Sequence, residues 1–326
     1  MTLRVAVVSG GPSAEAEVSR SSARGVCAAL ERAGHQPLLL ELTSQLPAAL
    51  QHAVDVVFPV THGAVGEDGC LQGMLEVLAL PYVGSGVLAS ALAASKPHAK
   101  VLFRAAGLPV ADGFALAQDE HLQQRVTEAR RLLTGSLVVK PASGGSAIGV
   151  EILPAECSAE ELRGAVERVF RLDESVLVER FITGVEVTCG VLEADEGLLA
   201  LPPTLIRPRA AEHYDFISKY QPGGSEHVCP APLPFELLER IRVAALAAHV
   251  ALGCRDLSRI DFLVEASGPG SFVVLEANTL PGMTPMSLFP EAAAIAGIPF
   301  EALCDRLVRR AMARPRREAP QAFAMP

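Results

Sequence analysis

Two short apolar segments with polar residues at alternate positions constrain the fold of this chain more than any other feature. They are SRIDFLVE at residues 258–265 and FVVLEAN at residues 272–278, with glycine and proline between them. Alternate residues of a strand share a face, which places Arg259 beside Asp261 in the first strand and Glu276 beside Asn278 in the second. A turn centred between residues 268 and 269 brings Asp261 opposite Glu276. The sequence therefore predicts a β-hairpin with four polar side chains on one face.

This polar face predicts a site for a divalent metal ion. Two carboxylates so close together repel each other unless a cation lies between them, and a set of oxygen ligands suits Mg²⁺ or Mn²⁺. The alternative is a solvated hairpin face that binds nothing. The metal site is favoured because the strands are otherwise apolar and are expected to be buried.

Length and composition indicate a globular protein of two or three domains. Half of the 326 residues are apolar, and no run of about 18 uncharged apolar residues predicts a membrane span. The start of the chain lacks the features of a signal peptide, so we expect a cytoplasmic protein. A net charge of -9 argues against nucleic acid as a partner. The seven cysteines are scattered and are expected to be free thiols.

Lysine is rare in this chain. Only four of the 28 basic residues are lysines, namely Lys96, Lys100, Lys140 and Lys219. A lysine kept in an arginine-rich chain indicates a position that needs a compact ammonium group rather than a planar guanidinium group. All four lysines fall in segments that other features also single out.

The first 95 residues are expected to form an open parallel α/β domain. Three apolar runs are typical of buried parallel strands, at residues 3–8, 37–42 and 54–59. Helices are expected between and after these strands, at residues 18–33, 70–80 and 87–106. The last helix is interrupted at Pro97, which places a domain boundary near residue 95.

Two further domains are expected at residues 96–182 and 183–314, followed by a frayed tail at 315–326. The predicted strands are 136–140, 147–153, 175–181, 185–192 and 198–206, besides the hairpin. One helix is predicted to begin at Ser158, which opens a capping box. Two more helices are predicted at residues 235–253 and 299–314. A polar loop is expected at 213–226.

A glycine-rich loop follows the predicted strand that ends at Lys140. The segment from 138 to 150 is VVKPASGGSAIGV. Its backbone N–H groups could surround a phosphate while Lys140 supplies positive charge. The spacing differs from the G-x-x-x-x-G-K-[ST] pattern, and an ordinary hairpin turn is the alternative.

Glu15 and His62 follow the first and third predicted strands of the N-terminal domain. Ligands of open α/β sheets bind in the crevice beyond the carboxyl ends of the strands, where Glu67 is also expected. The G-x-G-x-x-G pattern of dinucleotide sites is absent, and a carboxylate at Glu15 suits a ligand that carries an amine. The alternatives are that Glu15 only complements the start of a helix and that His62 is structural.

The chain resembles the D-alanine:D-alanine ligases, a family with the ATP-grasp fold, in seven motifs that occur in register. The motifs are GGPSAEAEVS at 10–19, HGAVGEDG at 62–69, PYVGSG at 81–86, KPAS at 140–143, YDFISKY at 214–220, RID at 259–261 and EANTLPGMT at 276–284. The resemblance implies mixed α/β and α+β architecture, in which an N-terminal open parallel α/β domain precedes the ATP-grasp fold. It also implies a homodimer.

The resemblance implies ATP-dependent ligation of two D-alanines through an acyl phosphate, for peptidoglycan precursor synthesis, with two Mg²⁺ or Mn²⁺ ions. The residues that it assigns to ATP are Lys96, Lys140, Ser143, Gly145, Ser146, Glu179, Arg180, Ile182, Glu186 and Lys219. The metal ligands that it implies are Asp261, Glu276 and Asn278. These are the polar residues that the hairpin pattern brings together.

The same resemblance assigns substrate and catalytic roles. Glu15 corresponds to the residue that binds the ammonium group of the first D-alanine. Ser146 and Tyr220 correspond to its hydrogen-bonded partners, and Arg259 and the Gly282 amide correspond to the groups that stabilise the oxyanion. The remaining substrate-binding residues that it implies are His62, Lys219 and Ser287.

The chain departs from the family pattern at a few positions that carry no proposed ligand or catalytic group. Ala147 replaces a common serine in the phosphate loop, and Ile217 interrupts the polar loop expected to close over the site. Two alternatives stay open. One is a relative that joins D-alanine to D-lactate, D-serine or another acceptor, and the other is a non-catalytic ATP-binding regulator.

Overall fold

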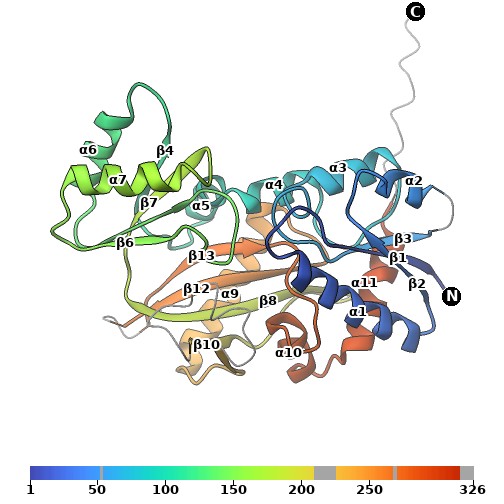
Figure 1. Ribbon diagram of the computed structural model, residues 1–326. Coiled ribbons are helices and arrows are strands. Elements are labelled where there is room, and N and C mark those ends of the chain that lie inside the picture. Colours follow the sequence, from blue (N-terminus) through green and yellow to red (C-terminus); the bar gives the residue numbers. More distant parts are fainter. Residues whose placement is uncertain (52–53, 209–224, 267–269, 316–326) are drawn as a thin grey trace, which may run out of the picture.

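The computed structural model describes residues 1–51, 54–208, 225–266 and 270–315. In these ranges three β-sheets and their helices make up the molecule (Figure 1). The turn of the predicted hairpin, Lys219, Tyr220 and the tail from 316 onward lie outside the described residues. Among the described helices, none combines the length and apolar character needed to cross a membrane.

The N-terminal sheet is parallel, with the order β2-β1-β3. Its strands are β1 (Arg4–Ser9), β2 (Gln36–Glu41) and β3 (Val56–Pro59), and its helices are α1 (Ala16–Arg32), α2 (Leu46–Leu50) and α3 (Cys70–Val77). The prediction of buried strands is correct for β1 and β3 but wrong for β2. This strand lies at one edge of the sheet, where Leu38 and Leu39 are 44% and 50% exposed, whereas β3 at the other edge is bridged by Tyr82 at Val57.

The central sheet is antiparallel, with the order β4-β7-β5-β6. Its strands are β4 (Gly113–Ala117), β5 (Leu137–Pro141), β6 (Glu151–Leu153) and β7 (Ser175–Arg180), and its helices are α6 (Leu122–Leu132) and α7 (Ala159–Val169). The predicted capping box of α7 is confirmed, because Ser158 Oγ accepts from Glu161 N and Glu161 Oε2 accepts from Ser158 N. Neither β4 nor α6 was expected from the sequence.

The predicted strand at 147–153 is wrong over its first half. Residues 146 and 147 have φ angles of +58° and +57°, and Gly149 has a φ of +74°. Extended backbone requires negative φ, so the chain turns here and β6 begins only at Glu151. The glycine-rich loop is therefore longer than its sequence suggested.

The C-terminal sheet has the order β11-β10-β8-β12-β13, and β9 also pairs with β8. Its strands are β8 (Gly184–Ala194), β9 (Gly197–Ala200), β10 (Thr204–Pro208), β11 (Ser225–Val228), β12 (Leu257–Glu265) and β13 (Phe272–Asn278). The helices are α9 (Phe235–Leu252), α10 (Leu288–Ile295) and α11 (Phe300–Ala313). The predicted strand at 198–206 is two strands, because Pro202 and Pro203 lack the N–H groups that would continue the ladder.

Helices α4 (Val87–Ala94) and α5 (Lys96–Ala105) connect the N-terminal sheet to the rest of the molecule (Figure 1). Ala99 and Phe103 of α5 are buried in the same core as α9 and β12. A second core joins β1 and β3 to α11. The predicted domain boundaries near residues 95 and 182 stay a prediction, and two of the hydrophobic cores extend across them.

Candidate active site

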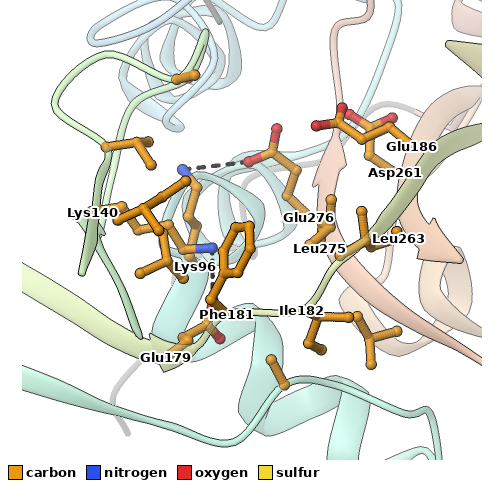
Figure 2. Close-up of a pocket in the computed structure, with 18 of the residues that line it drawn as sticks. Lys96, Lys140, Glu179, Phe181, Ile182, Glu186, Asp261, Leu263, Leu275 and Glu276 are labelled. Carbon is orange, nitrogen blue, oxygen red and sulfur yellow. Dashed lines mark ion pairs between the residues drawn. The ribbon is translucent and has the colours of Figure 1, made fainter. Parts of the chain in front are cut away.

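A cavity of about 830 Å³ lies between the central sheet and the C-terminal sheet (Figure 2). We call one side the hairpin wall, which Asp261, Leu263, Val273, Leu275 and Glu276 form. We call the other side the loop wall, which Lys140, residues 143–148 and residues 179–182 form. Of the residues expected to bind ATP, those that line the cavity are Lys96, Lys140, Ser143, Gly145, Ser146, Glu179, Arg180, Ile182 and Glu186.

The predicted hairpin and its register are confirmed. Asp261 pairs with Glu276 and Arg259 pairs with Asn278 in the antiparallel ladder of β12 and β13. A β-bulge after Asp261 shifts the register of the remaining pairs by one residue. Because the shift lies on the turn side of Asp261, the four polar residues keep the relation that strand alternation predicts.

Cations of the protein already compensate both hairpin carboxylates. Arg259 donates two hydrogen bonds of 2.8 Å to Asp261, one to each carboxylate oxygen. Lys96 Nζ lies 3.4 Å from Glu276 Oε2. The sequence placed Arg259 beside Asp261 but did not reveal that Lys96 compensates Glu276, so cations of the protein relieve the repulsion without a metal ion.

Asp261 is held by more groups than the sequence suggested. Thr188 Oγ1 on β8 donates to Asp261 Oδ1 at 2.7 Å, and Asn278 Nδ2 donates to Asp261 Oδ2 at 3.0 Å. Thr188 was not predicted as a site residue. Its signal lies only in the pairing of β8 with β12, where it stands opposite Asp261.

The glycine-rich loop is held in place by contacts with three other segments. Ser143 donates to Asp173 through its N–H and its Oγ, both at 2.7 Å. Lys96 Nζ donates to Gly144 O at 2.5 Å. Ser146 Oγ donates to Glu15 Oε1 at 2.6 Å, which joins this loop to the N-terminal domain.

Ser146 and its neighbour Ala147 adopt the left-handed conformation that favours glycine. This conformation costs a non-glycine residue about 1–2 kcal/mol. At Ser146 the strain places the hydroxyl against Glu15, where it donates a charge-assisted hydrogen bond. A functional position explains the retained strain better than an ordinary hairpin turn does.

Two lysines share one buried carboxylate on the loop wall. Lys140 Nζ lies 2.7 Å from Glu179 Oε2 and Lys100 Nζ lies 2.6 Å from Glu179 Oε1. Burial alone would raise the pKa of Glu179, but the charges of Lys140 and then Lys100 outweigh it and hold this pKa below its ordinary value. Figure 2 shows Lys140 reaching Glu179 while Lys96 reaches Glu276 on the opposite wall.

One end of the cavity is apolar and suits a flat aromatic group. Ala111, Ile182 and Val273 form a small buried cluster, against which Leu263 and Leu275 pack. Phe181 N donates to Ser136 O at 2.8 Å, so the connector after β7 remains attached to the central sheet. Arg207 on β10 also lines the cavity, a position that no motif singled out.

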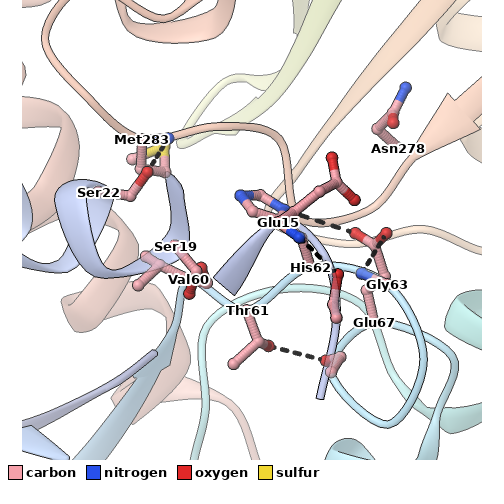
Figure 3. A network of polar contacts seen from close by, with 12 residues as sticks. Glu15, Ser19, Ser22, Val60, Thr61, His62, Gly63, Glu67, Asn278 and Met283 are labelled. Carbon is pink, nitrogen blue, oxygen red and sulfur yellow. Dashed lines mark hydrogen bonds and ion pairs between the residues drawn. The ribbon is translucent and has the colours of Figure 1, made fainter. Parts of the chain in front are cut away.

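The N-terminal domain contributes Glu15, His62 and Glu67, whose side chains point toward one another (Figure 3). His62 Nδ1 lies 3.8 Å from Glu67 Oε2, and Gly63 N donates to Glu67 Oε1 at 2.9 Å. Burial disfavours the charged form of His62, but Glu67 and then Glu15 outweigh this effect and raise its pKa. This cluster can hold a cationic group next to two carboxylates.

Gly282 and Ser287 lie on the segment between β13 and α10. A Cβ atom at Gly282 would lie 3.0 Å from Ser287 Oγ, so a side chain here would require Ser287 to shift slightly. Ser287 Oγ is 2.7 Å from Thr284 Oγ1 and accepts from Thr284 N at 3.1 Å. Met283 N donates to Ser22 Oγ at 3.4 Å, which attaches this segment to α1 (Figure 3).

Comparison with known proteins finds similarity along almost the whole chain. Two family profiles match, described as D-ala D-ala ligase C-terminus at residues 102–309 and D-ala D-ala ligase N-terminus at residues 41–85. A D-alanine–D-alanine ligase of Gluconobacter oxydans is 43% identical over 317 residues, which cover 96% of this chain and 100% of the relative. The corresponding protein of Granulibacter bethesdensis is 44% identical over 316 residues, with coverages of 95% and 98%.

Solved structures with similar folds include a D-alanine–D-alanine ligase and a D-Ala:D-Ser ligase. A D-alanine–D-alanine ligase from Bacillus anthracis has a TM-score of 0.81 at 34% identity, with coverages of 96% and 98%. The VanG D-Ala:D-Ser ligase from Enterococcus faecalis has a TM-score of 0.82 at 29% identity, with coverages of 95% and 100%. Overall fold similarity alone therefore does not separate acceptors within this group.

Proposed function

Because the chain belongs to the D-alanine–D-alanine ligase family of ATP-dependent ligases, we propose that it joins two D-alanines to D-alanyl-D-alanine for cell-wall synthesis. ATP becomes ADP and phosphate in this reaction. The observation that supports the proposal best is the cavity itself, which has a glycine-rich loop on one wall and an acidic hairpin on the other. The hydrogen bond from Ser146 to Glu15 joins the N-terminal domain to the same site.

We assign the nucleotide to the cavity. The apolar end formed by Ile182, Val273 and Leu275 suits adenine, and Glu186 lines the cavity nearby, as a ribose contact would require. Lys96 and Lys140 extend into the other end, where compact ammonium groups suit phosphate oxygens. Loop residues 143–147 lie beside these lysines and can offer backbone N–H groups.

Asp261, Glu276 and Asn278 fit a hard divalent cation, because they present carboxylate and amide oxygens on one strand face. Among the described residues no three His, Cys, Asp or Glu side chains gather in a metal site, so phosphate oxygens and water would have to complete the coordination. We propose two Mg²⁺ or Mn²⁺ ions, which when bound would neutralise charge on the phosphates. To coordinate the ions, Asp261 and Glu276 would exchange their contacts with Arg259 and Lys96 for contacts with the metal.

The first D-alanine is placed by its charges. Glu15 lies next to Ser146 and near His62, and it accepts the substrate ammonium group in our assignment. The substrate carboxylate then faces the terminal phosphate of ATP. A carboxylate oxygen forms a bond to that phosphorus as the bond to ADP breaks, and this step gives an acyl phosphate.

The second D-alanine attacks with its neutral amine. Its nitrogen forms a bond to the acyl carbon, the bond from that carbon to phosphate breaks, and the amine proton passes to the departing phosphate. Arg259 and the Gly282 N–H face the oxyanion in this assignment, and Ser287 binds the second carboxylate. The closing roles predicted for Lys219 and Tyr220 concern residues outside those described.

Acceptor choice is the part of the proposal that needs its own test. We would supply ATP, Mg²⁺ and D-alanine with equal amounts of D-lactate or D-serine, and identify the products by mass. We expect D-alanyl-D-alanine to dominate. A dominant mixed product would replace the proposal with a specialised D-alanine ligase. The non-catalytic alternative is disfavoured because Arg259, Asp261, Glu276 and Asn278 are all retained on one face.

A further inference from the structure

Helix α5 places two ammonium groups on the same side of the molecule. Lys96 and Lys100 are four residues apart, which puts them on one helical face. Lys96 reaches Gly144 O and Glu276, while Lys100 reaches Glu179 behind the loop wall. Lys100 does not line the cavity, although both Glu179 and Lys140 do. The proposed mechanism gives Lys100 no role.

Burial of the Lys100 ammonium group costs desolvation free energy. Its side chain is 3% exposed and that of Glu179 is 2% exposed, so both charges have left water. A buried charge is retained only when partners compensate it. Phe103, on the next turn of α5, is fixed in the core shared with α9 and β12. Lys100 therefore connects that core to β7 of the central sheet.

The charges of the buried group do not cancel. Glu179 carries one negative charge and receives two ammonium groups, Lys100 on one oxygen and Lys140 on the other. The sum is one positive charge. Without Lys100, Glu179 would neutralise Lys140 completely. With Lys100, one net positive charge remains at the loop wall, next to the glycine-rich loop.

We propose that Lys100 is a positioning residue for the nucleotide, which shares Glu179 with Lys140 and so leaves Lys140 able to attract the phosphates of ATP. This inference rests on the proposed function, since it takes ATP as the ligand of the cavity. The chemistry is general, because a carboxylate shared by two cations neutralises less of the charge of each than a carboxylate with one partner does.

The affinity for ATP should depend on pH through Lys100. Burial, together with the charges of Lys140 and Arg104, lowers the pKa of Lys100 to about 8 against the opposing effect of Glu179. ATP binding that prefers charged Lys100 therefore weakens as pH rises above about 8. Below that pH the affinity should not depend on this group.

The test is the affinity for ATP, measured by calorimetry with Mg²⁺ and without D-alanine, for the unaltered protein, K100M and K100R. We expect K100M to bind ATP about 10-fold more weakly at pH 7, which corresponds to 1.4 kcal/mol. K100R keeps its charge at every pH used, so its affinity should stay flat to pH 9.5, whereas that of the unaltered protein should fall above pH 8. K100M should lose this pH dependence.

A second variant separates charge from simple disruption of the fold. The double variant K100M/E179Q again leaves one positive charge, on Lys140, and should recover most of the affinity lost in K100M; E179Q alone is measured beside it because Glu179 lines the cavity. R163M removes a half-exposed positive charge on α7, outside the cavity lining, and should stay within twofold of the unaltered protein. Thermal unfolding of each variant shows whether it is folded.

The outcomes distinguish failure of the proposed function from failure of the role given to Lys100. An unaltered protein that binds no ATP would overturn the proposed function. ATP binding by the unaltered protein together with K100M affinity within twofold of it would overturn the role of Lys100 alone. A loss in K100M that E179Q does not restore would also overturn it, because the effect would then not follow the charge.

Discussion

The hairpin wall and the loop wall hold carboxylates under opposite conditions. Asp261 and Glu276 keep 13% and 22% of their side chains exposed, and each has one cation as its main ionic partner. Glu179 is 2% exposed and divides its two oxygens between two lysines. The carboxylates of the hairpin wall can exchange their partners for a ligand, whereas Glu179 is committed to holding lysines. Position in the cavity alone would not reveal this difference.

Substitution of Glu276 by Gln should have the largest effect. Loss of one charged oxygen ligand on the hairpin wall removes several kcal/mol of charge stabilisation, so we expect dipeptide formation to fall by about three orders of magnitude. The matched control is E265Q, which changes the same residue type on β12 away from the cavity and should stay within twofold. Near-normal turnover of E276Q in a coupled ADP assay would remove Glu276 from the metal site.

Replacement of Arg259 by Lys tests whether this residue, which bonds to Asp261 of the hairpin wall, stabilises the transition state. Lysine cannot donate the two parallel hydrogen bonds that Arg259 gives to Asp261. We expect kcat to fall about 100-fold with a smaller change in KM. R240K, at an exposed position of α9, is the control. A change confined to the KM for D-alanine would mean that Arg259 only binds the ground state.

Ser146 on the loop wall should give an intermediate effect. Its hydroxyl donates to charged Glu15, a type of bond that contributes about 1.5–3 kcal/mol. Both S146A and S146G should lower kcat/KM for D-alanine by roughly 10-fold or more. The glycine variant should unfold at higher temperature than the alanine variant, since only glycine relaxes the φ of +58°. Equal melting temperatures would contradict the strain argument.

The smallest effect expected concerns His62 and pH. Its pKa is raised in the folded protein, so it contributes stability that is fully present below its unfolded pKa, near 6.5. That contribution is lost as pH rises through the folded pKa. Between pH 6 and pH 8.5 the free energy of unfolding should therefore fall slightly more in the unaltered protein than in H62Q. Identical changes in denaturant titrations of both proteins would contradict this assignment.

The sequence predicts the hairpin wall far better than the loop wall, for a physical reason. Strand alternation and a glycine-proline turn suffice to place Asp261 opposite Glu276, because both effects are local. The partners of Glu179 come from β5 and α5, which only the tertiary fold brings together. The scarcity of lysine and the four-residue spacing of Lys96 and Lys100 were the available signals for the helix contribution.

Other errors have equally specific causes. Periodicity could not show that β2 lies at a sheet edge, since an apolar run looks the same in a central or an edge strand. The left-handed backbone at Ser146 and Ala147 accompanies a contact with distant Glu15, which the local sequence does not show, so a strand was expected from Ala147 onward. The family resemblance supplied the site roles that the residue pattern alone left open.

The most direct test of the central claim is the stoichiometry of one reaction in which ADP, phosphate and D-alanyl-D-alanine are measured together. With ATP, Mg²⁺ and D-alanine we expect equal amounts of the three products, and almost no phosphate when D-alanine is left out. Phosphate release that is independent of D-alanine, or ATP binding without any dipeptide, would contradict the assignment of the two walls to a ligase.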